Sequence, residues 1–220
     1  MLNTCIQKIR ESAYGDYEII VVDDSSSPPL CVSDPNVRVI VSENNIGPGG
    51  ARNLGAHMAR GDILLFIDSD VVLSRNAYRE IVGPLNAPDL DAVYGIYSLD
   101  FPYGNFCSKY KNLYWNFNQM QLEQSSYNIC TAIFSIRRDV FDEIGGFNLS
   151  SLVGEDREIG LKLKGKNKRI FLNKKAQGAH YKKFDFLQLL KHHLQNSVAY
   201  ALLFLKSKSG HSSRDGKGLV

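Results

Sequence analysis

Two apolar runs, each ending in acidic residues, constrain the fold of this 220-residue chain more than any other feature. The stretch EIIVVDD ends in Asp23 and Asp24, and the stretch ILLFIDSD ends in Asp68 and Asp70. Neither run alternates with polar residues, so each predicts a strand that is buried on both faces, as in a parallel sheet. Helical periodicity between the two runs predicts right-handed crossovers, and hence an α/β fold.

The same kind of pattern continues along the rest of the chain. A helix is expected near the start, where Leu2, Cys5, Ile6 and Ile9 recur at helical spacing. Further helices are expected at 51–59, 78–85, 101–122, 137–144, from 154 onward and at 184–206, and strands at 38–41, 92–97, 129–136, 169–172 and 176–180. The Ser/Gly/Lys-rich stretch 207–220 is expected to be a disordered basic tail.

Composition excludes several classes of protein. With 44% hydrophobic and 22% charged residues, the chain is typical of a globular domain and unlike disordered, collagen-like or coiled-coil proteins. Its longest apolar run, VAYALLFL, is far shorter than the ~20 residues of a spanning helix, and its N-terminus lacks the pattern of a secretory signal. The four cysteines lie far apart without a CxxC pair, which fits neither disulfides nor a zinc site. We therefore expect a cytoplasmic protein.

Charge is distributed unevenly along the chain. Residues 1–156 contain 11 Lys and Arg against 20 Asp and Glu, a net charge of −9, whereas residues 157–220 contain 15 against 3, a net charge of +12. An acidic front half suits a metal site. The basic rear half suits an anionic partner such as a phospholipid surface or a phosphorylated substrate, or is a solvated tail. We expect no nucleic-acid partner.

The acids after the second apolar run have the spacing of a metal site. Asp68 and Asp70 follow a buried strand and should emerge at its carboxyl end, where open α/β sheets bind ligands. Carboxylate oxygens two residues apart select Mg²⁺ or Mn²⁺, which commonly bridge a protein to substrate phosphates. The alternative is an acid pair that only caps a turn.

A second group of polar residues is expected at the same edge of the sheet. Asp23 and Asp24 end the first run and can accept hydrogen bonds from a ribose or a base, or can simply start a turn. The glycine-rich NNIGPGGARN does not fit the spacing of a dinucleotide-binding loop. Arg52, in the first turn of the helix that follows, is a candidate donor to a phosphate, with a surface arginine as the alternative.

Taken together, these stretches resemble the family 2 glycosyltransferases with the GT-A fold. The matching blocks are EIIVVDDSS, NNIGPGGARNLGAHMARGDILLFIDSD, IFSIRRDVFDEIGGF and GEDREIGLKLKGKNKRIF, in the family's order, and the resemblance covers about residues 3–181. It implies an α/β, Rossmann-like nucleotide-diphospho-sugar transferase fold, with a mostly parallel sheet flanked by helices. It also implies a nucleotide-sugar donor, with UDP-sugar preferred, and a carbohydrate or lipid-linked acceptor.

The resemblance also implies roles for the acidic residues at the sheet edge. Asp24, with Asp23 beside it, would contact the nucleotide, and Arg52 would lie near the base and phosphates. Asp68 and Asp70 would hold the metal ion and the donor diphosphate.

Three residues nearer the C-terminus receive roles in the same way. Asp156 would act as the general base, with Glu155 as its orienting neighbour, and this placement implies inversion at the sugar carbon. His180 would complete the metal or diphosphate site. Without the resemblance, Glu155 and Asp156 are ordinary acids at a helix N-terminus, and His180 is a packed or surface histidine.

The chain departs from the family pattern at its start. Family members begin with a central strand, and here Met1 stands where the helix after that strand should begin. Its loss would leave two strand edges unpaired, so nucleotide binding is expected to be poor unless another strand fills the gap. The expected division is therefore an N-terminally truncated catalytic domain at 1–183, an amphipathic helix at 184–206 and the tail at 207–220.

The helix expected at 184–206 carries one apolar stripe, formed by Phe184, Leu187, Leu190, Leu194, Val198, Ala201 and Leu205. Flanking lysines make peripheral docking on the inner face of a membrane one interpretation, and packing against the domain is the other. The aromatic segment 101–117 likewise suits either core packing or stacking on a sugar ring.

Two other functions stay open at this point. ILLFIDSDVV also resembles the start of a haloacid-dehalogenase-like phosphatase, with Asp68 as nucleophile and Asp70 as acid and base, although that family's later motifs are poorly matched. The other alternative is an inactive membrane-docking remnant, suggested by the absent first strand and the basic tail.

Overall fold

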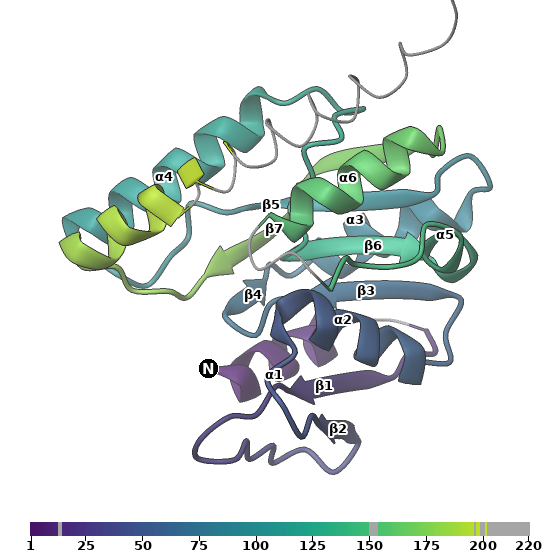
Figure 1. The fold of residues 1–220 in the computed structure, drawn as a ribbon, viewed down its shortest axis with the longest axis horizontal. Helices are drawn as coiled ribbons and strands as arrows, with labels where there is room; N and C mark the ends of the chain where they lie inside the picture. Colours follow the sequence, from purple (N-terminus) through teal and green to yellow (C-terminus); the bar gives the residue numbers. More distant parts are fainter. Residues whose placement is uncertain (13–14, 150–153, 196, 199–200, 202–220) are drawn as a thin grey trace, which may run out of the picture.

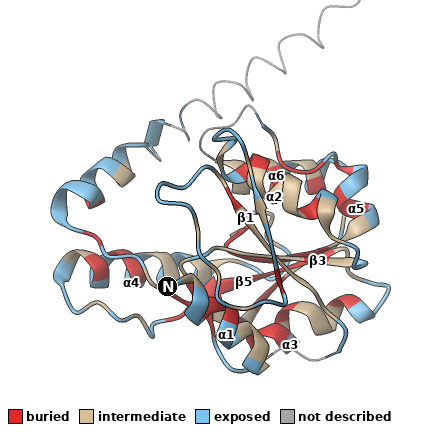
Figure 2. Cartoon of the chain, turned by 90° about the horizontal axis from the view of Figure 1, so that it is seen from below, coloured by how far each residue is buried: buried red, intermediate tan, exposed pale blue. Residues whose placement is uncertain are grey.

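The computed structural model describes residues 1–12, 15–149, 154–195, 197–198 and 201, and places helices on both faces of a β-sheet (Figures 1 and 2). The strands are β1 (Ile19–Asp23), β2 (Val37–Val41), β3 (Ile63–Ile67), β4 (Val71–Leu73), β5 (Ala92–Tyr97), β6 (Ile133–Arg137) and β7 (Ile170–His180). The helices are α1 (Leu2–Ser12), α2 (Gly47–Met58), α3 (Ala77–Val82), the 3-10 helix η1 (Gly83–Asn86), α4 (Phe106–Gln121), α5 (Arg138–Glu143) and α6 (Glu155–Gly165).

The described strands form two separate sheets. β1 and β2 pair in parallel, and the other five strands follow the order β3-β6-β5-β7-β4. In the larger sheet only the β5–β7 pairing is parallel, because β6 runs antiparallel to both β3 and β5, and β4 runs antiparallel to β7. The predicted α/β class is therefore confirmed, while the parallel pairing expected from the buried runs holds only for β1–β2 and β5–β7.

The edges of β1 and β3 explain why their apolar runs are less buried than expected. Each strand has one partner, β2 for β1 and β6 for β3, so one edge of each is unpaired among the described residues. Four of the five residues of β1, and four of the five of β3, are only partly buried. The prediction that both strands are buried on both faces is wrong for this reason, whereas the expected pair of open edges is present.

Two hydrophobic clusters lie on opposite faces of the larger sheet. One cluster joins β-strand residues such as Phe134 and Leu172 to α5 and α6 through Phe141 and Leu163. The other joins Val71 and Ile133 to α3 and α1 through Ile81 and Ile9. Figure 2 shows the same arrangement, with α2, α5 and α6 on one side of the strands and α1 and α3 on the other.

Strand β7 differs most from the sequence prediction. The two short strands expected at 169–172 and 176–180 are one strand of 11 residues, which pairs with both β5 and β4. Its register against β5 shifts between Tyr94 and Ile96, and there a Cβ on Gly95 would lie 2.3 Å from the carbonyl oxygen of Ala176. The bulge therefore needs glycine, and the irregular pairing lets one long strand end at His180, beside Asp70.

The C-terminal part of the chain is described only in part. Residues 186–195, 197–198 and 201 are helical, in agreement with the helix expected at 184–206. The helix thus begins two residues later than expected, after Phe184 and Asp185, and the rest of it and the tail expected at 207–220 lie outside the described residues. Within the described part, no helix combines the length and apolarity needed to cross a membrane.

Candidate active site

The two aspartates that end β1 hold the loops around them. Asp23 is buried and accepts hydrogen bonds from the backbone N–H groups of Ser26, at 2.9 Å, and Leu30, at 3.0 Å. Hydrogen bonds from Ser26 and Leu30 lower the pKa of Asp23. Asp24 accepts from the backbone N–H groups of Ile46, at 2.7 Å, and Gly47, at 2.9 Å. Asp24 thereby anchors the start of α2, where the helix dipole favours a negative charge.

Arg52 connects Asp68, a predicted ligand of the donor diphosphate, to Glu155, the neighbour of the predicted base. It lies on α2, one turn after Gly47, and its Nη2 donates to Oδ1 of Asp68 at 2.7 Å. Its Nη1 donates to Oε1 of Glu155 at 3.2 Å, and the guanidinium lies 5.4 Å from the ring centre of Phe147. Burial lowers the pKa of Arg52, but Asp68 and the other nearby carboxylates raise it above its ordinary value. The alternative interpretation of Arg52 as a surface arginine is thus wrong, because only 14% of its side chain is exposed.

Asp156 is the acid that the structure perturbs most. It is the second residue of α6, and the helix begins after Gly154, whose φ of 92° favours glycine. Burial raises the pKa of Asp156 to about 6, against the lowering effects of Thr131 and Arg52. The Thr131 hydroxyl donates to Oδ1 of Asp156. A carboxyl group with a pKa near neutrality within a group of acids is a candidate general base.

Asp70 and His180 approach each other at the end of β7. Nε2 of His180 lies 3.5 Å from Oδ2 of Asp70, and the histidine is 4% exposed. Burial would raise the pKa of Asp70, but the neighbouring His180 and Lys182 lower it below its ordinary value. Nδ1 of His180 is buried and has no hydrogen-bond partner among the residues that the structure describes. His180 is therefore packed against the site, where it faces Asp70 directly.

The donor set at this place suits a divalent ion only in part. Within the described residues, no three His, Cys, Asp or Glu side chains gather as a preformed metal site. Asp70 and His180 offer one oxygen and one nitrogen that converge, whereas Asp68 is hydrogen-bonded to Arg52. Two protein ligands fit Mg²⁺ or Mn²⁺ when phosphate oxygens and water supply the rest.

Thr131 and Tyr97 also belong to this site, and the sequence interpretation did not single them out. Both are buried. Burial raises the pKa of Tyr97 well above its ordinary value, and Asp68, Asp156 and Asp70 all add to this effect. The tyrosine therefore lies close enough to these three acids to sense their charge. The sequence signal was weak, since Tyr97 ends an apolar run and Thr131 precedes one.

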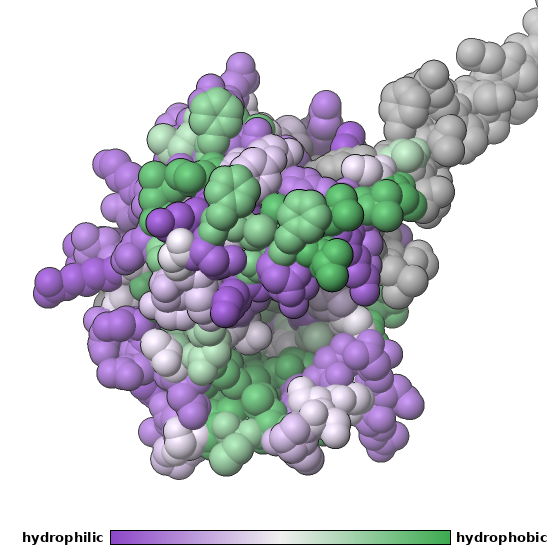
Figure 3. All heavy atoms as spheres, turned by 90° about the vertical axis from the view of Figure 1, so that its left-hand side faces the viewer, coloured by the Kyte–Doolittle hydropathy of each residue, from purple (hydrophilic) through white to green (hydrophobic). Residues whose placement is uncertain are grey.

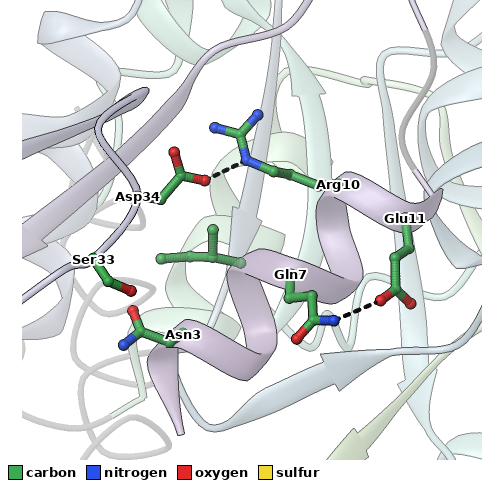
Figure 4. Close-up of a pocket in the computed structure, with 7 residues that line it drawn as sticks. Asn3, Gln7, Arg10, Glu11, Ser33 and Asp34 are labelled. Atoms are coloured by element: carbon green, nitrogen blue, oxygen red, sulfur yellow. Dashed lines mark hydrogen bonds and ion pairs between the residues drawn. The ribbon is translucent and has the colours of Figure 1, made fainter.

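A pocket in the described part of the chain lies away from these residues. Figure 4 shows it between α1 and the loop before β2, lined by Arg10, Gln7 and Asp34 among others, with a volume of about 500 Å³. The Arg10–Asp34 ion pair joins its two walls. None of the predicted site residues lines it. The candidate site is therefore defined by its side chains at the strand ends.

The predicted residues thus fall into connected groups. Arg52 bridges Asp68 to Glu155, and its electrostatic environment includes Asp156. His180 contacts Asp70, which follows Asp68 by two residues. Asp23 and Asp24 join the group indirectly, through the loop and the α2 N-terminus that they hold.

Comparison with known proteins places this arrangement in a family. A model of glycosyl transferase family 2 matches residues 1–145. Glycosyltransferase GlyG of Streptococcus pneumoniae is 34% identical over 110 residues, which cover 46% of this chain and 36% of that protein. WfgD of Escherichia coli, a UDP-Glc:alpha-D-GlcNAc-diphosphoundecaprenol beta-1,3-glucosyltransferase, is 26% identical over 103 residues, which cover 44% of this chain and 41% of that protein. The chain spans less than half of the length of these two relatives.

Solved structures with a similar fold include two enzymes bound to nucleotide and metal. The mannosyltransferase PcManGT from Pyrobaculum calidifontis, in complex with GDP-Man and Mn²⁺, has a TM-score of 0.62 at 17% identity and covers 83% of this chain and 53% of its own. GalNAc-T7 with UDP, GalNAc and Mn²⁺ has a TM-score of 0.58 at 18% identity and covers 76% of this chain and 38% of its own. These likenesses show that the fold is GT-A. Because the family model covers more than half of the sequence and the fold agrees with it, this chain belongs to glycosyl transferase family 2.

Proposed function

We propose that this chain transfers a sugar from a nucleotide diphosphate, by preference a UDP-sugar, to an acceptor hydroxyl, with inversion at the sugar carbon. The observation that carries the proposal is the Arg52 bridge, which holds Asp68 and Glu155 together beside a carboxyl whose pKa is about 6. The similarity to WfgD, a glucosyltransferase that uses UDP-Glc and a diphosphoundecaprenol-linked acceptor, supports a UDP-sugar donor, a lipid-diphosphate acceptor and a role in cell-envelope or surface polysaccharide synthesis.

On the donor side, the proposal uses the acids at the ends of β1 and β3. Asp24 contacts the nucleotide, and the buried Asp23 supports this contact through the loop that it holds. Arg52 and Asp68 hold the donor near its diphosphate. Arg52 suits this task because a guanidinium keeps its charge and its planar donor geometry when it is partly buried. The charge of Arg52 also offsets the negative charge that the departing nucleotide diphosphate acquires.

A divalent ion belongs to the proposed mechanism. Asp70 and His180, with Asp68 beside them, would hold Mn²⁺ or Mg²⁺. When bound, such an ion neutralises charge on the diphosphate leaving group. Tyr97 packs against His180, with ring centres 4.8 Å apart, and thereby fixes the orientation of the imidazole.

On the acceptor side, Asp156 is proposed to take the proton of the attacking hydroxyl. Its pKa of about 6 leaves it ionised at neutral pH and close enough to the operating pH for efficient proton transfer. Glu155 orients the site by its hydrogen bond from Arg52. Such general-base help typically contributes about 10²- to 10⁴-fold in rate.

The proposal also covers organisation and location. Residues 1–183 form the catalytic domain, 184–206 an amphipathic helix and 207–220 a basic tail. We place the protein in the cytoplasm, at the inner face of the membrane, with a peripheral contact through the helix at 184–206. The acceptor is a carbohydrate or lipid-linked glycan.

The test is hydrolysis of UDP-, GDP- and TDP-sugars by the protein with Mn²⁺, measured as release of the nucleotide diphosphate. Asp156→Asn should abolish the activity, and Asp142→Asn, an exposed acid on α5, should leave it unchanged. The proposal would be overturned if none of these donors were hydrolysed. So would hydrolysis of p-nitrophenyl phosphate that is lost in Asp68→Asn, because that result indicates a phosphatase.

A further inference from the structure

The apolar stripe of the C-terminal helical segment faces solvent in its described part. Phe184 and Leu189 are buried and attach the segment to the domain. Leu187, Leu190 and Leu194 of the predicted stripe are exposed, with Leu187 at 75%. Packing against the domain therefore accounts for only the first residue of the stripe.

Helix α4 presents a second exposed apolar face. Phe106 and Phe117 are 78% and 63% exposed, and Tyr110, Leu113 and Tyr114 are exposed as well. The opposite side of the helix faces the domain through Ser108, Lys111 and Asn112, all of them buried. α4 is thus inverted relative to an ordinary surface helix, which turns its apolar face inward.

These two faces adjoin one another. The ring of His193 lies 6.2 Å from that of Tyr110 and 5.7 Å from that of Tyr114, and the side-chain amide of Asn105 donates to the carbonyl oxygen of Phe184. Figure 1 shows the segment beside α4, and Figure 3 shows apolar side chains gathered on this side of the molecule. We name this the helix-pair surface, and its exposed apolar residues are Phe106, Tyr110, Leu113, Tyr114, Phe117, Met120, Phe186, Leu187, Leu190, Leu194 and Val198.

Charge around the helix-pair surface has one dominant sign. The 16 residues of α4 include no acidic side chain. The exposed lysines of the surface and its margins are Lys109, Lys182, Lys183 and Lys191, against two exposed acids, Asp185 and Glu123, the latter just after α4. Apolar side chains bordered by lysines match the boundary between headgroups and acyl chains of an anionic membrane. A second copy docked face to face would bring lysines against lysines, which disfavours a symmetric dimer.

We propose that the helix-pair surface docks on an anionic phospholipid bilayer, with the apolar side chains of both α4 and the C-terminal segment inserted at the interface. The inference extends the peripheral contact included in the proposed function from one helix to two. It also connects the membrane to the active site. The indole of Trp115, on α4, lies 4.9 Å from the ring of His180, which faces Asp70. A docked protein would therefore hold its acidic site next to the lipid surface.

The test is co-sedimentation of the full chain with vesicles, without donor and without any activity measurement, so that lipid binding and transferase activity can fail separately. The vesicles are phosphatidylcholine alone, or phosphatidylcholine and phosphatidylglycerol in equal parts. We expect binding to the anionic vesicles that weakens as salt rises. Lys182→Gln with Lys183→Gln should weaken this binding about ten-fold.

Three variants separate the apolar contribution of each helix from a general effect of surface mutation. Leu187→Gln with Leu190→Gln, and Phe106→Gln with Phe117→Gln, should each weaken binding about ten-fold or more. Leu161→Gln is the matched control, because Leu161 is an exposed leucine on α6, outside the helix-pair surface. Circular dichroism checks that each variant is folded.

Three results would overturn the inference. The first is wild-type protein that stays in the supernatant with anionic vesicles. The second is loss of binding in Leu161→Gln equal to that in the leucine pair. The third is a dimer in sedimentation velocity without lipid that Leu187→Gln with Leu190→Gln converts to monomer, because the surface would then join two copies of the chain.

Discussion

Nη2 of Arg52 donates a 2.7 Å hydrogen bond to Oδ1 of Asp68, and so ties helix α2 to the residue that follows strand β3. The same guanidinium reaches Glu155, which is 103 positions further along the chain. One side chain thus connects three elements and partly neutralises three nearby acids, Asp68, Glu155 and Asp156.

Removal of this charge should destabilise the protein. Arg52→Gln leaves Asp68 and Glu155 partly buried without a cation, and we expect the free energy of unfolding to fall by about 1–3 kcal/mol, since solvent screens part of the interaction. Denaturant unfolding measures the change. Arg60→Gln is the control, because the Arg60 side chain is 85% exposed and pairs with Glu18 at the surface. An equal loss in both variants would contradict a special role for Arg52.

The activity should depend on the ionisation of Asp156. Because its pKa is about 6, the carboxyl is protonated and inactive as a base below that pH, and kcat/KM should rise with pH through about 6 and then level. A pH profile of donor hydrolysis or transfer measures this. A value of kcat/KM that stays constant from about pH 5 to about pH 8 would show that Asp156 is not the base.

Ionisation of Asp156 should lower the free energy of unfolding, whereas ionisation of a carboxyl group paired with a cation raises it. Its folded-state pKa is raised from 3.8 to about 6, so ionisation in the folded protein costs stability as pH increases between these values. Asp156→Asn should therefore be more stable than wild type at neutral pH, by on the order of 1–3 kcal/mol, with the difference vanishing below about pH 4. Thermal unfolding of both proteins across this range tests the sign.

Thr131 is expected to position the base. Its hydroxyl donates to Asp156 and lowers the pKa of that carboxyl, so Thr131→Val should shift the acidic limb of the pH profile to higher pH. Thr131→Ser keeps the hydroxyl and should restore the wild-type limb. If valine and serine variants share one profile, the hydrogen bond does not tune the base.

The metal requirement can be tested at Asp70 and His180. Chelation with EDTA should abolish donor hydrolysis, and addition of Mn²⁺ should restore it. Asp70→Asn and His180→Gln should each raise the Mn²⁺ concentration needed for half-maximal activity about ten-fold or more, because each removes one convergent ligand. Asp62→Asn, just before β3, serves as the control. Full activity in EDTA would remove the ion from the mechanism.

Much of the fold followed from local patterns. The apolar runs before Asp23 and Asp68 predicted β1 and β3, and helical spacing predicted α1, because side-chain periodicity reports secondary structure directly. The glycines that stop α5 and the acids that open α6 predicted those two helices. The antiparallel placement of β6, the continuity of β7 and the short strand β4 were not predicted. Strand direction and pairing depend on contacts between distant segments, which periodicity does not encode.

For the candidate site, the sequence by itself determined which residue types stand at the strand and helix ends: acids after β1 and β3, an arginine on α2 and an acid pair opening α6. Only the tertiary structure decided how they meet. It set Arg52 between Asp68 and Glu155, buried His180 against Asp70, brought Thr131 to Asp156 and turned the aromatic face of α4 outward. The physical reason is that burial, charge pairing and pKa depend on neighbours that lie far away in the sequence and become adjacent only when the chain is folded.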